Sequence, residues 1–357
     1  MSDRWALPPL SEGEFAPEFF APTRANPNFH FNTVAGRYVL LGLMPRDTAA
    51  EAEAAAALAP IRALLNDRHV CGLMISPQGD FANVPPDAVP GVRWFLDPDA
   101  KVASRFGDEP GWVLLDPTLR VMARSPLSET QAMLQRISAL PPVAMHAGAP
   151  LIAPVLVVPR VFEPEFCRKL MAYYDAQGGQ VSGVMRDIGG RTVGVLDNMK
   201  SRRDVSVTDP ELKAGIMTGL DRNLSGMIRR AFHFNPTRLE RYLIACYDAG
   251  EGGFFRPHRD NVSLGTAHRK FAVSINLNAE DFEGGDLRFP EFGPRTYRPP
   301  TGGAVVFCCS LLHEATPVTR GRRYAVLPFL YDAAGEAIRQ QNMDKLDTGP
   351  ALRLDTR

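Results

Sequence analysis

The chain has 357 residues, enough for two domains that each bury a core of their own. Its 40 basic and 40 acidic side chains cancel, so no long-range field favours nucleic acid or an anionic membrane surface. There is no run of about 18 apolar residues and no apolar signal segment near the N-terminus, so neither a membrane span nor secretion is expected.

The cysteines are odd in number and show no C-x-x-C spacing. This pattern argues against a disulfide framework or a structural zinc site and favours a reducing, cytoplasmic compartment. The five cysteines are Cys71, Cys167, Cys246, Cys308 and Cys309. The adjacent Cys308 and Cys309 lie in an apolar run and are expected to be small buried side chains.

Strand and helix patterns alternate through the first 140 residues, which predicts an α/β layer fold. Buried strands are expected within 36–46 and 69–76, a strand followed by a short helix within 92–107, and two strands around an Asp-Pro turn within 111–125. Helices are expected at 48–68, which is rich in alanine, and at 128–140, which Ser128 is expected to cap.

A stretch rich in proline, alanine and glycine, 141–154, breaks both patterns and is expected to be a linker. Helices are predicted at 163–177 and 209–231. Short strands with Gly/Pro turns follow from residue 239 to 332, typical of a sandwich or jelly roll. The expected organisation is a domain at 1–140, the linker, a second domain at 155–335 and a tail at 336–357.

Three residues of the second half have the types and spacing of a metal site. His258 and Asp260 are two positions apart, so in an extended segment both side chains project from the same face. His313 follows about fifty residues later, just past the apolar run 302–310. Two histidines and one carboxylate form the facial triad of non-haem iron(II), which leaves coordination positions open for a 2-oxo acid and dioxygen. Each residue alone is weak evidence, but their order and strand context fit one chemistry.

A basic residue follows this group. Arg323 opens the predicted strand that ends near residue 332, and a guanidinium binds a carboxylate bidentately and stays charged. It is the candidate for binding the distal carboxylate of 2-oxoglutarate. Arg322 is the alternative, although its side chain should point to the opposite face of the strand.

From Leu239 to Asp332 the sequence resembles the prolyl-4-hydroxylase-like branch of the 2-oxoglutarate/iron(II) dioxygenases. The motifs that carry the resemblance are Ala245-Cys246-Tyr247, Pro257-His258-Arg259-Asp260, Phe271–Asn278, Gly284–Pro290 and His313–Arg323. The resemblance implies a double-stranded β-helix, or jelly roll, with flanking helices. It implies iron(II) ligands at His258, Asp260 and His313, and 2-oxoglutarate binding by Arg323 and Tyr247. A structural core tyrosine is the alternative for Tyr247.

The activity implied is hydroxylation of a C–H bond, coupled to decarboxylation of 2-oxoglutarate to succinate and carbon dioxide, with ascorbate as a candidate reductant. An aspartate at the carboxylate position favours hydroxylation over halogenation. The substrate is expected to be a peptide or protein side chain, or a small molecule. The segment 200–204 lies where this family often has a substrate-facing loop; it either binds an acidic or peptide substrate or is a solvated charged turn, and the latter is favoured. Arg256, Asn261 and His268 are candidates for supporting the ligands.

The first half resembles the peroxiredoxins, a family with a thioredoxin-like fold. The resemblance rests on 13–19, Met44–Thr48, 96–99 and 111–117. In peroxiredoxins the reactive cysteine lies at the start of a helix, a few residues after the proline that ends the first buried strand. Here that strand is expected within 36–46, and the segment 46–54 that follows contains no cysteine. Cys71 is expected to be inert core. We therefore expect a degenerate redoxin domain used for dimerisation, docking or stability, and a homodimer. A thiol redox protein and a non-catalytic metal-binding module are the alternatives.

Overall fold

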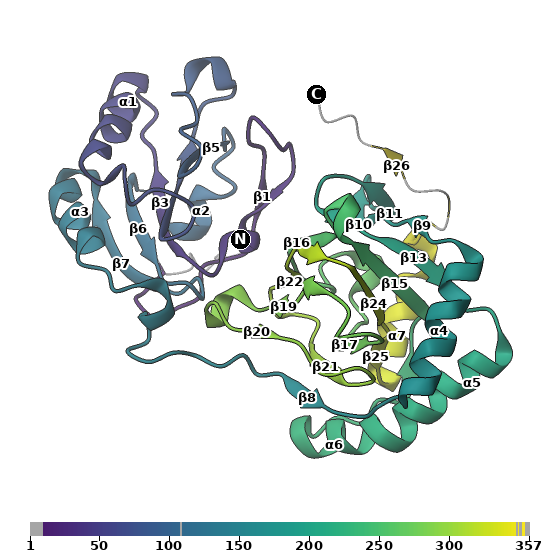
Figure 1. Ribbon diagram of the computed structural model, residues 1–357. Helices are drawn as coiled ribbons and strands as arrows, with labels where there is room; N and C mark the ends of the chain where they lie inside the picture. The colour runs from purple at the N-terminus through teal and green to yellow at the C-terminus, as the bar shows by residue number, and fades with distance from the viewer. Residues whose placement is uncertain (1–9, 108, 348, 350–351, 354–357) are drawn as a thin grey trace. The chain divides into compact units, whose positions relative to one another are not determined.

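The computed structural model describes residues 10–107, 109–347, 349 and 352–353. The chain divides into two compact units, and both combine helices with strands (Figure 1). One unit comprises the chain up to Ile152 together with Pro290–Pro294, and the other comprises Ala153–Phe289 and the chain from Arg295 onward. Within the described residues, no helix is long and apolar enough to cross a membrane.

The first unit is built on a mixed sheet with the strand order β5-β4-β3-β6-β7. β3, β4 and β5 run parallel, whereas β6 is antiparallel to both β3 and β7. β3, β4 and β6 are buried along their whole length, as expected for strands covered on both faces. The elements are β1 (Phe20–Ala21), β2 (Phe29–His30), β3 (Tyr38–Leu43), α1 (Thr48–Ala56), β4 (Val70–Ser76), β5 (Val92–Leu96), α2 (Ala103–Phe106), β6 (Gly111–Leu115), β7 (Val121–Pro126) and α3 (Thr130–Ser138).

Two helix predictions in this unit need correction. The helix expected at 48–68 ends at Ala56, and a short 3-10 turn with Pro60 follows, because proline lacks the N–H that a continuing helix needs. Ser128 does not cap the next helix: it lies inside a 3-10 turn, and α3 begins at Thr130 without a side-chain cap.

The second unit contains two main sheets, two smaller groups of paired strands and a set of helices. The larger sheet has the order β14-β25-β17-β24-β15-β13-β9, with β21 added to β17 and β8 to β21. Its strands are β8 (Leu156–Val158), β9 (Gln180–Val181), β13 (Arg203–Ser206), β14 (Arg238–Leu239), β15 (Leu243–Asp248), β17 (Phe271–Asn276), β21 (Ala304–Cys308), β24 (Arg322–Val326) and β25 (Phe329–Tyr331).

The smaller sheet has the order β12-β16-β22-β19-β20. Its strands are β12 (Lys200–Ser201), β16 (Phe254–His258), β19 (Leu287–Arg288), β20 (Thr296–Tyr297) and β22 (His313–Ala315). Two further groups complete the strands: β10 (Val184–Ile188) and β11 (Arg191–Leu196) with β26 (Leu352–Arg353), and β18 (Glu283–Gly284) with β23 (Val318–Arg320). The strands from β9 to β13 were not predicted from the sequence, which is polar and lacks clear alternation there.

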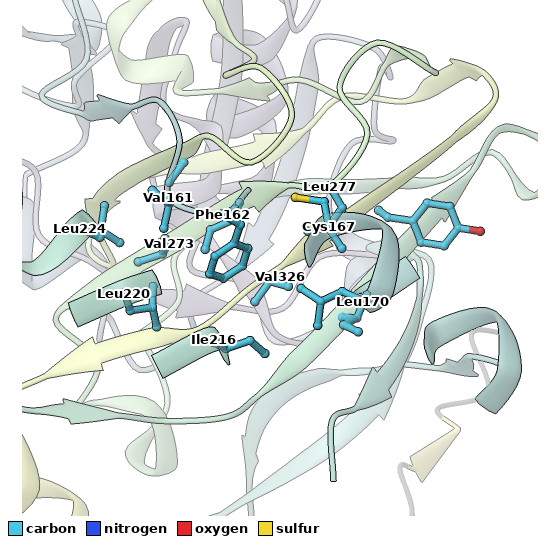
Figure 2. Close-up of a cluster of buried hydrophobic side chains, with 14 of the residues drawn as sticks. Val161, Phe162, Cys167, Leu170, Ile216, Leu220, Leu224, Val273, Leu277 and Val326 are labelled. Atoms are coloured by element: carbon cyan, nitrogen blue, oxygen red, sulfur yellow. The ribbon is translucent and has the colours of Figure 1, made fainter. Parts of the chain in front are cut away.

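The helices of this unit are α4 (Pro164–Gln177), α5 (Pro210–Gly219), α6 (Gly226–Phe232) and α7 (Ala333–Gln341). A π-helical segment, Leu220–Ser225, joins α5 to α6, so the predicted helix 209–231 is one continuous helical run. Figure 2 shows the main core, in which apolar side chains of α4 and of this run pack on β17 and β24. The helices therefore cover one face of the larger sheet.

A second apolar cluster lies between the two sheets. It joins Leu243, Ala245 and Tyr247 of β15 to Ala315 of β22, with Phe255 of β16 packed against it. The larger sheet thus has helices on one face and the smaller sheet on the other. The residues predicted to bind metal and cosubstrate lie on this second side.

Candidate metal centre

Strand pairing brings the two predicted metal-binding histidines together. β16 and β22 are antiparallel neighbours, and His258 stands directly opposite His313 in their register. Side chains opposite each other on adjacent strands point to the same face and are close. The two imidazole rings are accordingly 4.3 Å apart between centroids.

Asp260 completes the group just beyond the end of β16. Its backbone N–H donates to the carbonyl of Cys309 over 3.0 Å, which fixes the turn after the strand. One carboxylate oxygen lies 3.5 Å from Nε2 of His258, and the other lies 3.3 Å from Nε2 of His313. Each of the three residues has a ligand atom within 4.8 Å of the others.

The histidines have the protonation pattern that metal binding requires. Nδ1 of His258 lies 2.8 Å from the carbonyl of Arg256, and Nδ1 of His313 lies 3.0 Å from that of Leu311. A carbonyl oxygen can only accept, so each Nδ1 donates to its carbonyl and each Nε2 is turned toward the carboxylate of Asp260. Burial and the neighbouring His313 lower the pKa of His258 to about 4, so this imidazole is neutral at neutral pH.

The carboxylate of Asp260 stays ionised. Burial alone would raise its pKa, but His313 and His258 outweigh burial and hold that pKa well below its ordinary value. The two imidazoles and the carboxylate therefore lie close enough together to bind one ion, and they form a donor set suited to iron(II).

The second pair of predicted site residues is also in register. Tyr247 of β15 stands opposite Arg323 of β24, and the guanidinium carbon of Arg323 lies 5.2 Å from the centre of the tyrosine ring. Both side chains are buried. Arg322 points to the other face, as expected, where it is exposed and donates to Asp248 over 2.7 Å.

No carboxylate forms an ion pair with Arg323 within the part of the chain that the structure describes. Its Nε donates to the side-chain oxygen of Asn276 over 3.2 Å, and Nη2 donates to the hydroxyl of Ser274 over 2.7 Å. Nη1 is buried and has no hydrogen-bond partner among the described residues. A buried guanidinium that leaves one N–H donor without an acceptor is costly unless an anion binds there. The arrangement therefore fits a carboxylate ligand beside the metal-binding group.

Three residues near this centre were not identified from the sequence: two neutral hydrogen-bond partners of Arg323 and one aromatic residue beside His258. Ser274 and Asn276 occupy alternate positions of β17 and so share the face on which Arg323 lies. Phe255 stacks on the ring of His258, with ring centroids 3.4 Å apart. The alternation of polar residues within the apolar strand 271–276 was the available signal for Ser274 and Asn276.

The segment 200–204 departs from the favoured interpretation of a solvated charged turn. The side chain of Arg202 is buried, and its Nη2 donates to Asp204 over 2.7 Å. Arg203, by contrast, is exposed and pairs with Glu251. The solvated-turn interpretation is therefore wrong for Arg202.

The three candidate supporting residues have different surroundings. His268 is buried and bonds to Glu240, so it is not part of the metal-binding group. The side-chain amide of Asn261 donates to the Ser310 hydroxyl over 2.8 Å, which anchors the residue after Asp260. Arg256 donates to a backbone carbonyl at Asn198.

Comparison with known proteins agrees with the chemistry of this site. Residues 242–331 match the 2OG-Fe(II) oxygenase superfamily. A PKHD-type hydroxylase of Synechococcus sp. (strain JA-2-3B'a(2-13)) is 27% identical over 142 residues, which cover 38% of this chain and 61% of that protein. A PKHD-type hydroxylase of Cupriavidus metallidurans is 29% identical over 184 residues, covering 48% of this chain and 75% of the relative. The chain thus spans about three-fifths of the length of the Synechococcus relative.

Solved structures give matches of the same kind. A prolyl-4-hydroxylase of Pseudomonas putida is 19% identical, with a TM-score of 0.39 and coverage of 50% of this chain and 92% of that chain. A prolyl hydroxylase of Trichoplax adhaerens, in complex with a hypoxia inducible factor oxygen degradation domain peptide fragment, is 17% identical, with a TM-score of 0.42 and coverage of 59% and 96%.

Proposed function

We propose that this chain, whose C-terminal half carries a 2OG-Fe(II) oxygenase domain of the PKHD/prolyl-hydroxylase type, is a 2-oxoglutarate-dependent hydroxylase. In the proposed reaction, dioxygen contributes one oxygen atom to a substrate C–H bond, giving an alcohol, and the other to 2-oxoglutarate, giving succinate and carbon dioxide. The observation that carries the proposal is the placement of the Arg323 guanidinium, whose Nη1 has no partner among the described residues, on the sheet that faces the group of His258, Asp260 and His313.

The metal ligands in this proposal are Nε2 of His258, a carboxylate oxygen of Asp260 and Nε2 of His313. Iron(II) bound there supplies activation of dioxygen coupled to oxidative decarboxylation of the 2-oxo acid. The protein holds the ligands ready: each histidine is oriented through its Nδ1 by a backbone carbonyl, and Asp260 is fixed through its own N–H.

The distal carboxylate of 2-oxoglutarate would bind Arg323. Ser274 and Asn276 hold two guanidinium nitrogens and leave Nη1 for the anion. The apolar side chains between the sheets, including Phe282 and Val318, exclude water around this contact and strengthen it. The chain's contribution is therefore orientation and desolvation, whereas the oxidation belongs to the metal.

The substrate in this proposal is a peptide or protein side chain, or a small molecule; the relatives are named PKHD-type hydroxylases, which supports hydroxylation as the reaction. The domain would be a double-stranded β-helix; the two packed antiparallel sheets and their covering helices support this assignment. Ascorbate as a reductant and a homodimer complete the proposal.

For the N-terminal unit we propose a thioredoxin-like domain without peroxidase activity. The mixed five-strand order and the helix that follows β3 support this fold. No cysteine occurs in 46–54, and burial raises the pKa of Cys71 to about 12, which leaves its thiol protonated and unreactive. The unit would serve docking, dimerisation or stability.

Succinate formation tests the proposal. Purified protein with iron(II), ascorbate, 2-oxoglutarate and a panel of proline-containing peptides should release succinate, and Asp260→Ala should stop this release. Peroxide consumption that survives Asp260→Ala and disappears in Cys71→Ser would instead identify a thiol redox protein. A metal-loaded protein that binds 2-oxoglutarate but forms no succinate with any substrate tested would favour a non-catalytic binding module.

A further inference from the structure

A row of three side chains crosses the larger sheet beside the metal-binding group. In the β13–β15 register Arg203 faces Cys246, so the residue before β13, Arg202, comes opposite Tyr247. Tyr247 in turn faces Arg323 on β24. One tyrosine ring is thus flanked by two buried guanidiniums, with the carbon of Arg202 5.7 Å and that of Arg323 5.2 Å from the ring centre.

The hydrogen bonds within this row have one possible direction. Nη1 of Arg202 lies 3.3 Å from the hydroxyl oxygen of Tyr247. A guanidinium only donates, so the tyrosine oxygen accepts and its own proton remains to be donated. Among the described residues none accepts that proton, and Nη1 of Arg323 also lacks a partner. The Tyr247 hydroxyl and Nη1 of Arg323 are thus two buried donors available to an anion, and Nε of Arg202 is a third buried donor without a partner among these residues.

Arg202 is itself held in place. Its Nη2 donates to Asp204, which stands opposite the small Ala245 in the next row on the same face. Burial alone would lower the pKa of Arg202, but Asp204 and Tyr247 outweigh burial and raise it, so the guanidinium is permanently charged. The pair is nearly enclosed, with side-chain exposures of 4% for Arg202 and 12% for Asp204.

We propose that Arg202, held by Asp204, is a positioning residue for the cosubstrate: it fixes the Tyr247 hydroxyl so that its proton points to the carboxylate bound by Arg323. This inference rests on the proposed function, because it concerns how 2-oxoglutarate is oriented. Arg202 does not touch the cosubstrate; it determines the direction of a donor that does. The binding energy it contributes should therefore depend on the presence of the tyrosine hydroxyl.

The test deletes the buried pair without leaving a lone buried charge. In the double variant Arg202→Met/Asp204→Asn, the dissociation constant of 2-oxoglutarate, measured by calorimetry on manganese(II)-loaded protein, should rise about fivefold, the scale of one hydrogen bond. Tyr247→Phe should give a similar rise. Adding the pair deletion to Tyr247→Phe should produce no further loss.

Two controls separate positioning from structural damage. 2-Oxopentanoate chelates the metal but lacks the distal carboxylate, so its affinity should not change in the pair-deleted variant. The matched variant Arg203→Met/Glu251→Gln removes the neighbouring exposed ion pair and should bind 2-oxoglutarate as the wild type does. Asp204→Asn alone, which leaves Arg202 in place but less firmly held, is the milder second variant and should weaken 2-oxoglutarate binding about twofold.

The outcomes distinguish this inference from the proposed function. If the wild type does not bind 2-oxoglutarate, or Arg323→Met leaves its affinity unchanged, the cosubstrate site is misplaced and both proposals fail. If Arg323→Met abolishes binding but the pair deletion leaves affinity intact, or weakens it equally in the Tyr247→Phe background, only the role of Arg202 is refuted. A parallel loss of 2-oxopentanoate affinity would also refute it.

Discussion

Two glutamates, one in each unit, show how differently the two halves treat buried charge. Glu240 lies beside Arg269 and His268 and bonds to both. Glu51, in α1 of the first unit, is fully buried, and neither of its carboxylate oxygens has a hydrogen-bond partner. Glu240 in the second unit thus has two charged or polar partners, whereas none of the described residues forms a hydrogen bond with the carboxylate of Glu51 in the first unit. This difference predicts opposite responses of the two carboxylates to pH.

Removal of a metal ligand should give the largest effect. Asp260→Ala leaves two imidazoles without the anionic ligand, so iron(II) affinity should fall more than about 100-fold, beyond the usual effect of losing a group that only orients a ligand. Metal content after gel filtration measures this. Cys71→Ser in the first unit should retain full metal content; a loss there would break the distinction between the units.

Arg323→Met should come next. It removes the only charged donor proposed for the distal carboxylate, so the KM for 2-oxoglutarate should rise about 100-fold, the value of a buried charge-assisted hydrogen bond pair. Arg320→Met, which removes an exposed arginine paired with Glu283, is the matched control and should leave KM unchanged. Equal effects from both substitutions would contradict the assignment of Arg323.

Breaking the ion pair between Glu240 and Arg269 in the second unit should lower the free energy of unfolding by about 3 kcal/mol. Glu240→Gln leaves the buried Arg269 without its counter-charge, and Arg269 also donates to the backbone carbonyl of Asp260. Burial alone would raise the pKa of Glu240, but Arg269 and His268 hold it well below its ordinary value. Its stabilisation is therefore complete above the unfolded pKa of about 4.3 and is lost as pH falls below it.

Urea unfolding between pH 7 and pH 3 tests this prediction, with hydrogen exchange of β15 and β17 as the local readout. The free energy difference between wild type and Glu240→Gln should shrink as the pH falls. A difference that is constant over this range would mean that the charge of Glu240 is irrelevant.

The smallest change in stability is expected for Glu51→Gln, and it should be a stabilisation, opposite to the effect of Glu240→Gln. Burial raises the pKa of Glu51. The folded state therefore holds its proton more tightly, and stability that is present below about pH 4.3 is lost as pH rises through the folded pKa. Glu51→Gln should stabilise the unit by about 1 kcal/mol at pH 7 and by less at pH 4.

Tryptophan fluorescence during urea unfolding measures this locally, because Trp94 and Trp112 are buried in the core of the same unit. Destabilisation by Glu51→Gln at pH 7 would show that the carboxylate has a partner in solution, and would remove the contrast with Glu240.

The sequence predicted much of this site because the decisive relations are local or follow from strand alternation. His258 and Asp260 are two residues apart on one segment, and Arg323 and Arg322 were assigned to opposite faces correctly. The row of Arg202, Tyr247 and Arg323 could not be predicted in the same way, because it depends on which strands become neighbours and in which register.

The fold shows the same limit. Long apolar strands such as β3 and β4 and the helical run from Pro210 were predicted, because buried elements have a recognisable pattern of apolar residues in the sequence. The hairpin of β10 and β11 was missed: its residues are mostly half-exposed or exposed, so no apolar face marks it. Two local signals were misleading. Alanine-rich composition predicted a helix that continues past Pro60, but the helix ends before it, and Ser128 was predicted to cap a helix that begins only at Thr130.

The most direct test of the central claim is the anaerobic absorption spectrum of the protein with iron(II) and 2-oxoglutarate. Chelation of the 2-oxo acid by iron at the site of His258, Asp260 and His313 should produce a visible metal-to-ligand charge-transfer band, and His258→Ala should abolish it. A band of unchanged intensity in His258→Ala, or no band in the wild type, would contradict the assignment of this site.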